Sequence, residues 1–392
     1  MVQRSGRIRR QGTVEDVREI RRSRAGNGAP SRRCDRLSRI AEWIEPFFDL
    51  KEMPIASKEK ERSLFIAEGT ETVRMMMQRC GTCNVSSSSS KSIHTETDTP
   101  PPVRLISILS KPATFFDSPV HLLRDIEKCR SESSPVPPFK ILVASEEALS
   151  EIAGFPIARG AMACGVIPDF MQTNGYAWLK TLLSREPTPS TMMKTIQQHK
   201  PIRKLLALDA ISNAANMGSI LRTAAAFSID AIILSDDSCD AWYRQSVRTS
   251  MGHVVSVPIL RVADWERGIN NDHEGDGYDS KIVGLAGVLR WLREKMSVEC
   301  FAAVVDGNRK QRSPPLVTLE ADHECGCRSW CCVLGNEGHG IREEVIQECD
   351  KRLKIGMASG VDSLSLPIAA GILMHGLGSR SNTETSQRVL KS

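Results

Sequence analysis

The sequence lacks an apolar run long enough to cross a membrane. Its longest one, at about Leu364–Met374, is interrupted by Ser365 and Pro367 and falls short of the roughly 18–20 residues that a spanning helix needs. The N-terminus also lacks the apolar core of a secretory signal, and the acidic residues among positions 15–19 are atypical of an organellar presequence. We therefore expect an intracellular protein without a membrane partner, cytoplasmic in the first place, with the nucleus or an organelle as alternatives.

Aromatic residues are scarce, at 5%, but the contents of 41% hydrophobic and 25% charged residues are those of a globular chain. They exclude collagenous, fibrous and fully disordered proteins, and 392 residues suffice for two domains with tails. The first 40 residues contain 12 Arg, no Lys and four acidic residues, so they carry +8 while the whole chain carries +5. This basic segment favours a nucleic acid partner and a solubilising or targeting role about equally.

The 12 cysteines are spread along the chain without the density of a disulfide scaffold, which favours reduced thiols. Two clusters, Cys80/Cys83 and His323/Cys325/Cys327, have the residue types of a zinc site. Because one CxxC pair lies far from one CxC pair, we prefer free thiols in loops and expect no metal. Whether either cluster binds anything stays open.

Composition shifts divide the chain into two domains with tails. Five consecutive serines and three prolines mark a low-complexity insertion in the first domain, and Pro187 and Pro189 mark a linker. The expected parts are a disordered Arg-rich tail at 1–40, a first domain at 41–183 with the insertion at 84–102, a linker at 184–200, a second domain at 201–380 and a disordered tail at 381–392.

Apolar runs alternate with helical patterns in the second domain, which indicates an α/β fold with a mainly parallel sheet that binds ligands beyond the carboxyl ends of its strands. The expected strands are 205–208, 231–234, 254–260, 301–305, 332–334 and 353–355, and the expected helices are 281–295, 341–349 and 363–377. In the first domain we expect strands at 64–66 and 141–144 and helices at 71–78 and 146–152.

Three loops at such strand ends have residues suited to chemistry. In the first, Gly218 and the start of a helix can approach an anion, and Arg222 follows one turn later, although an Asn-capped helix with a solvated Arg explains the same spacing. In the second, Glu337 lies among three glycines whose spacing, GxxGxG, differs from that of a dinucleotide fold, and His339 reads as a solvated loop residue. In the third, Ser363 is suited to be a helix N-cap.

Together the loops resemble the three motifs of the SpoU (TrmH-type) RNA ribose methyltransferases of the SPOUT superfamily, over residues 205–377. The matching stretches are NAANMGSILRTAAAF at 213–227, VRTSMGHVVSVPI at 247–259, VLGNEGHGI at 333–341 and LKIGMASGVDSLSLPIAAGIL at 353–373. The stretches KERSLFIAEGTETVR at 60–74 and ILVASEEALSEIAGFPIARGAMA at 141–163 are similar to the smaller α/β/α, ribosomal-protein-like substrate-binding domain that often precedes this unit.

The resemblance implies a deep C-terminal trefoil knot, a homodimer, and S-adenosyl-L-methionine bound in the knot as methyl donor. It places Arg222, Asn216, Glu337 and Ser363 at positions for catalysis and substrate contact, and Gly335, Ile355, Leu364 and Met357 at the donor. The chain departs from the family at Gly356, where proline is usual, at Ser365, where asparagine is usual, and at Ala214, where proline is common.

The implied reaction moves a methyl group from a sulfonium to a ribose 2'-OH of RNA. That hydroxyl is a poor nucleophile at neutral pH, so we expect Arg222 to stabilise the forming alkoxide, and Glu337 to orient Arg222 or the donor. Two alternatives are a degenerate RNA-binding module of the same fold and a SPOUT base methyltransferase. Ribosomal RNA is slightly preferred over transfer RNA as the substrate because the first domain resembles ribosomal proteins.

Overall fold

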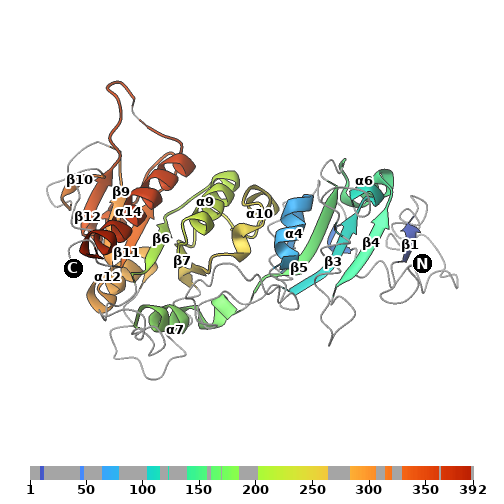
Figure 1. The fold of residues 1–392 in the computed structure, drawn as a ribbon, viewed down its shortest axis with the longest axis horizontal. Helices are drawn as coiled ribbons and strands as arrows, with labels where there is room; N and C mark the ends of the chain where they lie inside the picture. Colours follow the sequence, from blue (N-terminus) through green and yellow to red (C-terminus); the bar gives the residue numbers. More distant parts are fainter. Residues whose placement is uncertain are drawn as a thin grey trace. The chain divides into compact units, whose positions relative to one another are not determined.

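The computed structural model divides into two compact units, unit 1 (Met1–Pro168 and Asp240–Val255) and unit 2 (Asp169–Cys239 and Ser256–Ser392), each described here by itself (Figure 1). Within the described part of the chain, no helix is both long and apolar enough to cross a membrane. The structure describes residues 9–12, 45–47, 64–78, 104–114, 122, 139–156, 160–168, 170–184, 202–263, 283–305, 314–319, 329–361 and 363–389.

Unit 1 is built on a mixed five-stranded sheet in the order β1-β4-β3-β5-β2. β5 runs antiparallel to both its neighbours, whereas β1, β4 and β3 are parallel. The strands are β1 (Arg9–Gly12), β2 (Leu64–Glu68), β3 (Arg104–Ser110), β4 (Lys140–Ala144) and β5 (Ala161–Val166). β1 lies within the expected disordered tail, so its four residues differ from that expectation, while most of positions 1–40 lie outside the described residues.

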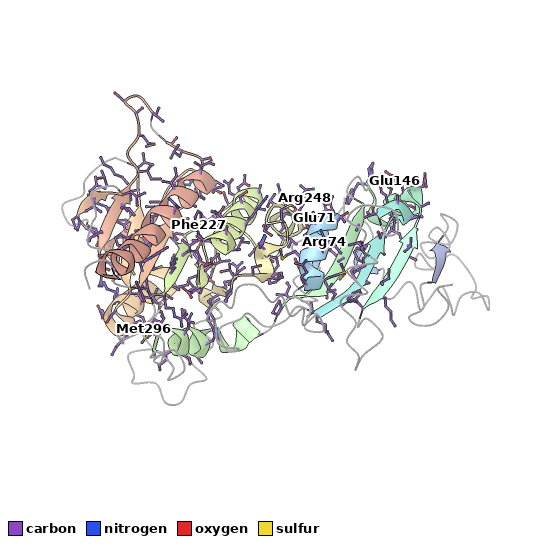
Figure 2. The ribbon with its side chains drawn as sticks, in the orientation of Figure 1. Glu71, Arg74, Glu146, Phe227, Arg248 and Met296 are labelled. Atoms are coloured by element: carbon purple, nitrogen blue, oxygen red, sulfur yellow. The ribbon has the colours of Figure 1, made fainter. Side chains whose placement is uncertain are left out.

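Short helices cover this sheet. On α4, Glu71 and Arg74 form an exposed ion pair of 3.1 Å (Figure 2). The segment 240–255 also packs here, because the rings of Trp242 and Phe65 lie 5.1 Å apart between centroids with a tilt of 42°, and Arg248 pairs with Glu68. The helices of unit 1 are η1 (Glu45–Phe47), α4 (Thr70–Gln78), α6 (Glu146–Ala153), α10 (Arg244–Thr249) and η3 (His253–Val255).

Unit 2 contains a fully parallel seven-stranded sheet in the order β10-β12-β9-β11-β6-β7-β8, as the alternation of strands and helices predicts. The central strands β11 and β6 are neighbours, with Leu334 opposite Leu208. The strands are β6 (Lys204–Leu208), β7 (Ala231–Leu234), β8 (Ile259–Arg261), β9 (Glu299–Ala303), β10 (Leu316–Thr318), β11 (Trp330–Leu334) and β12 (Lys351–Lys354).

Helices pack on both faces of this sheet. Alternate strand residues such as Leu205 and Val333 join α7, α12 and α13 in one buried core, while α9 and α14 pack against each other and α14 contacts β11. At the end of α9, the ring centroid of Phe227 (Figure 2) lies 5.8 Å from that of His375 on α14. The helices are α7 (Phe170–Ser184), α9 (Ala214–Ala226), α12 (Gly284–Met296), α13 (Glu343–Gln347) and α14 (Leu366–Val389).

The division between the units differs from the expected linker at 184–200. The chain divides at Pro168/Asp169, because α7 buries Leu179 and Leu183 in the core of unit 2 and packs the Tyr176 ring against the tilted ring of Trp291, 5.7 Å away between centroids. The segment 240–255 belongs to unit 1, although it lies between two strands of unit 2. The first linker residue, Ser184, is the last residue of α7. Residues 185–200 lie outside the described part of the chain, as do the insertion at 84–102 and Cys80, Cys83, His323, Cys325 and Cys327.

Several element bounds also correct the sequence-based expectation. The strand expected at 254–260 is reduced to β8, because its first residues form η3. β3, β5 and β10 are additional strands. α14 begins at Leu366, not at 363, and continues to Val389 through most of the expected disordered tail, a stretch that contains no proline or glycine after Gly378.

The described cysteines are reduced thiols, in agreement with the preference for reduced cysteines. Cys331 and Cys300 lie opposite each other on β11 and β9, and both are buried. The hydrogen bond with Cys300, together with burial, raises the pKa of the Cys331 thiol, and burial raises that of Cys349. These thiols therefore stay protonated and act as small apolar core residues.

Candidate active site

The site lies at the carboxyl ends of β6 and β11. Because these strands are adjacent and parallel, the loop that leads into α9 and the glycine-rich loop after β11 lie side by side. Asn213 caps α9, since its side-chain oxygen accepts hydrogen bonds from the backbone N–H groups of Ala215 and Asn216 at 2.8 and 3.2 Å. The asparagine cap expected from the sequence is therefore present.

Glu337 binds the start of α9. Its Oε1 accepts hydrogen bonds from the Asn216 Nδ2 at 3.0 Å and the Asn213 N–H at 3.2 Å. Its Oε2 accepts from the N–H and the hydroxyl of Ser212 at 3.2 and 3.0 Å. One carboxylate thus joins two of the three sequence motifs through four hydrogen bonds.

These bonds stabilise the charged form of Glu337. Partial burial acts to raise the pKa of Glu337, but the hydrogen bonds donated by Asn216 and Ser212 outweigh it, so that the pKa lies below its ordinary value. At neutral pH the side chain is therefore an anion and acts as an acceptor, which makes it a poor source of a proton.

The loop from Gly335 to Gly340 is a compact turn. Asn336 and Gly340 exchange two backbone hydrogen bonds of 3.0 and 2.9 Å, and the Asn336 Oδ1 accepts from the N–H groups of Gly338 and His339. The Asn336 Nδ2 in turn donates to the carbonyl of Ala210 at 2.7 Å. A Cβ at Gly335 would lie 2.3 Å from the backbone of Gly340, so this turn requires glycine there.

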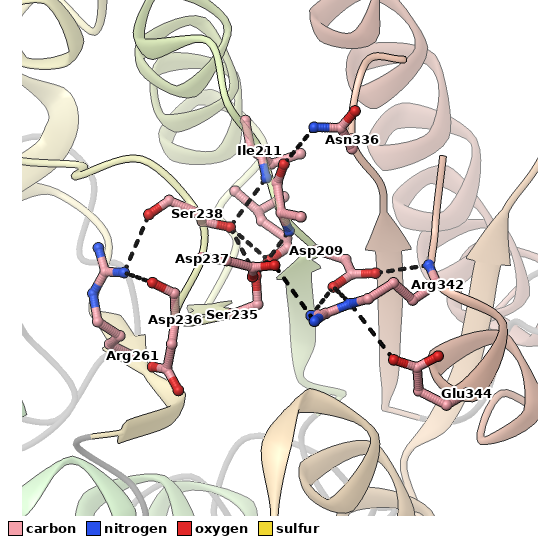
Figure 3. Close-up of polar contacts among 12 residues, drawn as sticks. Asp209, Ile211, Ser235, Asp236, Asp237, Ser238, Arg261, Asn336, Arg342 and Glu344 are labelled. Atoms are coloured by element: carbon pink, nitrogen blue, oxygen red, sulfur yellow. Dashed lines mark hydrogen bonds and ion pairs between the residues drawn. The ribbon is translucent and has the colours of Figure 1, made fainter. Parts of the chain in front are cut away.

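A second polar cluster lies beside this turn (Figure 3). Asp209, which directly follows β6, is fully buried and accepts hydrogen bonds from the Arg342 backbone N–H and Nε, each at 2.9 Å, and from its Nη2. Ser235 and Ser238, from the loop after β7, accept hydrogen bonds from the backbone N–H groups of Ala210 and Ile211. Three strand ends are thus joined by short polar contacts.

Arg342 also borders a cavity of about 390 Å³ next to the start of α12. Asp236, Asp237 and Glu344 line the same cavity, and Arg342 pairs with Asp237 and Glu344. This balance of charge disfavours an RNA phosphate in the cavity.

Arg222 lies apart from this network. It is exposed on α9, six residues beyond Asn216, which in an α-helix corresponds to about 9 Å along the axis. No hydrogen bond or ion pair joins its guanidinium to another residue within the described ranges. The side chain is therefore available to a ligand, and it does not contact Glu337, which we expected to orient either Arg222 or the donor.

The third motif forms an arm between β12 and α14 (Figure 1). Ile355 and Met357 are half-buried, whereas Ser363 and Leu364 are exposed. Within the described residues, no hydrogen bond joins Ser363 to Asn216, Arg222 or Glu337. The N-cap position of α14 is Ser365, whose carbonyl accepts from Ile368 and Ala369, and this corrects the assignment of the cap to Ser363.

The site also contains residues that were not predicted from the sequence, namely Asp209, Ser212, Asn336 and Arg342. The available signal was that Asp209 and Asn336 lie at or just beyond the ends of two apolar strands, where ligands of parallel sheets bind. Among the described residues, no group of three or more His, Cys, Asp or Glu side chains is arranged to hold a metal ion.

Comparison with known proteins points to one family. The model of the SpoU rRNA Methylase family matches residues 203–375. Over these residues the chain is similar to that family. An uncharacterized tRNA/rRNA methyltransferase of Mycobacterium tuberculosis is 27% identical over 232 residues, which are 59% of this chain and 64% of the relative. A 23S rRNA (guanosine(2553)-2'-O)-methyltransferase of Bacillus subtilis is 25% identical over 175 residues, 45% of this chain and 58% of the relative.

The SpoU fold is also found among solved structures. The SpoU methyltransferase AviRb from Streptomyces viridochromogenes, in complex with the cofactor AdoMet, matches with a TM-score of 0.53 and 15% identity, over 88% of this chain and 98% of that chain. This likeness shows the α/β fold with its parallel sheet. The chain spans less than two thirds of the length of the two relatives named above.

Proposed function

We propose that this protein is a SpoU family member and that it transfers a methyl group from S-adenosyl-L-methionine to a ribose 2'-OH of structured RNA. The observation that carries the proposal is the four-bond contact of Glu337 with Ser212, Asn213 and Asn216, because it assembles motif residues at one sheet edge. The name of the Bacillus subtilis relative specifies a 2'-O-methyltransferase of 23S rRNA, which supports the ribose as the acceptor and favours ribosomal over transfer RNA.

The residues assigned to the methyl donor suit it chemically. Gly335 is buried and has no side chain, so a ligand could contact its backbone directly. Ile355 and Met357 are half-buried and offer apolar contacts to an adenosine. Leu364, exposed on the arm, would add a further apolar contact. The bound donor supplies an electrophilic methyl group, and AviRb is named as a complex with the same compound. We propose no metal in the reaction, since displacement at a sulfonium needs none.

Arg222 is proposed to stabilise the alkoxide that forms as the ribose hydroxyl loses its proton. Its guanidinium is exposed and has no partner among the described residues, so binding RNA there disrupts no existing ion pair. A guanidinium stays protonated at all relevant pH values, which favours electrostatic stabilisation over a role as base. A phosphate or water would then take the proton. Asn216 and Ser363 are proposed to position the ribose.

A homodimer and a deep trefoil knot complete the proposal. Ile368 and Ile372 are exposed by 56% and 37%, and their spacing of four residues places them on one face of α14. Two exposed isoleucines on one helix face favour contact with an apolar partner surface, for which we propose a second copy of the chain. The strand order supports the knot. After β11 the chain crosses over β9, which comes earlier in the sequence, to form β12 on its other side before α14 begins.

The test is methyl transfer to RNA by the full chain. We would incubate the protein with S-adenosyl-L-methionine carrying a deuterated methyl group and with ribosomal or transfer RNA, digest the RNA to nucleosides and identify labelled products by mass spectrometry. Label on the ribose is the expected result. Label on a base would indicate a SPOUT base methyltransferase, and RNA binding without label would indicate the degenerate module.

A further inference from the structure

The contact between Asp209 and Arg342 joins two loops that are far apart in sequence. Asp209 is the first residue after β6, and Arg342 is the second residue after the glycine-rich turn. The side chain of Asp209 is fully buried, and both its oxygens accept from Arg342, one from the backbone and the other from the guanidinium. Loss of such a partner would leave a buried carboxylate without a compensating charge, which strongly destabilises the folded protein. The pair therefore holds the end of the turn against β6.

The guanidinium of Arg342 also lies close to two other carboxylates. Its Nη1 lies 3.4 Å from an oxygen of Asp237, and its Nε lies 3.8 Å from one of Glu344 (Figure 3). The hydrogen bond to Asp209 raises the pKa of Arg342 in spite of partial burial. The side chain is therefore a permanent cation that links the loops after β6, β7 and β11.

The two loops hold each other reciprocally. The first loop supplies Asp209, which binds Arg342 of the second, and the second supplies Glu337, which binds Ser212 and Asn216 of the first. Both ends of the glycine-rich turn are thus attached, since Asn336 also donates to Ala210. A shift of Arg342 away from Asp209 would release one end of the turn and move Glu337 relative to α9.

We propose that Asp209 and Arg342 are positioning residues, which hold Glu337 at the distance at which it binds Asn216 and the first turn of α9. Their effect on methyl transfer rests on the proposed function, whereas their effect on the loops does not. A purely structural pair would stabilise the fold without changing the order of the first turn of α9. Arg290 offers a matched control, because it forms an ion pair with Glu348 in the same unit, between α12 and the end of α13.

The first readout is hydrogen–deuterium exchange of the full-length protein at residues 212–218. Arg342→Gln removes the cation and shortens the side chain but keeps a polar amide, and we expect it to raise exchange there by roughly tenfold or more. Arg342→Lys keeps the charge but loses the planar fork, so an intermediate rise is expected. Arg290→Gln should leave this exchange unchanged. Equal exchange in wild type and Arg342→Gln would overturn the proposal, as would an equal rise in Arg290→Gln.

The second readout separates the positioning role from the proposed function. In single-turnover methylation, Arg342→Gln should lower the rate constant by roughly tenfold or more while RNA affinity stays within about twofold. Arg342→Lys should restore part of the rate. Because Asp209→Asn can fail to fold, the conclusion rests on the Arg342 variants, each melted beside Arg290→Gln. If wild type transfers no methyl group but exchange rises as expected, the proposed function fails and the pairing of the loops stands.

Discussion

The Glu337 carboxylate accepts a hydrogen bond of 3.0 Å from the side-chain amide of Asn216, a residue 121 positions earlier in the chain. The contact bridges neighbouring strands β6 and β11, and its strength depends on the charge of Glu337. It is the part of the proposed active site in which two sequence motifs touch.

Acidification should weaken this contact. The pKa of Glu337 is lowered in the folded protein. The charged carboxylate therefore stabilises the start of α9 fully above the ordinary glutamate pKa of about 4.3, and this stabilisation is lost as pH falls through the lowered value. We expect hydrogen exchange at residues 212–218, corrected for the intrinsic pH dependence, to rise only below that range. Glu337→Gln should show raised exchange at neutral pH and no further step on acidification. A step at the same pH in both proteins would assign the effect to another group.

Arg222→Ala should separate catalysis from stability. If Arg222 is only a solvated helix residue, its replacement by alanine should lower the free energy of unfolding by roughly 0.5 kcal/mol or less and leave turnover unchanged. As the group that stabilises the alkoxide, its loss should lower the single-turnover rate constant about a hundredfold while donor affinity stays close to wild type. Arg222→Lys should recover little, because it lacks the planar fork. Unimpaired transfer by Arg222→Ala would remove Arg222 from the active site.

Two glycines of the same turn should respond differently to alanine. A Cβ at Gly335 would overlap the backbone of Gly340 and Ile341, so Gly335→Ala should distort the turn, lower Tm and abolish donor binding. Gly340 has a φ of +72° but open space around a Cβ, so Gly340→Ala should cost only about 1–2 kcal/mol of backbone strain. Thermal melts and calorimetric titration with S-adenosyl-L-methionine distinguish the two. Equal losses in both variants would contradict a steric requirement at Gly335.

Ile368 tests the proposed homodimer. Because Ile368 is more than half exposed, Ile368→Glu should leave the fold of the single chain intact and should shift the sedimentation profile from dimer to monomer at micromolar concentration. Lys295→Glu changes a charge on α12, on the other face of the sheet, and serves as the control. A wild-type protein that sediments as a monomer would contradict the proposal directly.

Much of unit 2 could be predicted from the sequence because its strands are apolar runs bounded by polar loops. Leu205–Leu208 and Ala231–Leu234 correspond closely to β6 and β7, and the parallel sheet follows from the alternation with helices. β10 was missed because its three residues are only half-buried and carry no such run. The domain boundary was misplaced because the prolines after α7 end that helix without showing which core it joins.

The site was predictable only in part. Glu337 and Asn216 were identified because they lie in recognisable loops, and the structure brings them together. The pairing of Asp209 with Arg342 depends on which strands are neighbours, and strand order is not encoded in local spacing. The exposed position of Ser363 likewise depends on how the arm leaves β12, which no periodic pattern indicates.

The proposed methyl acceptor is a ribose hydroxyl, and a single substitution in the RNA distinguishes it from a base atom. After the methylated nucleotide has been mapped in a synthetic RNA, the same RNA would be made with a single 2'-deoxy nucleotide at that position. We expect the wild-type protein to label the all-ribose RNA and to leave the substituted RNA unlabelled, while both RNAs bind with similar affinity. Undiminished labelling of the 2'-deoxy RNA would contradict it, because the methyl group would then reside on a base.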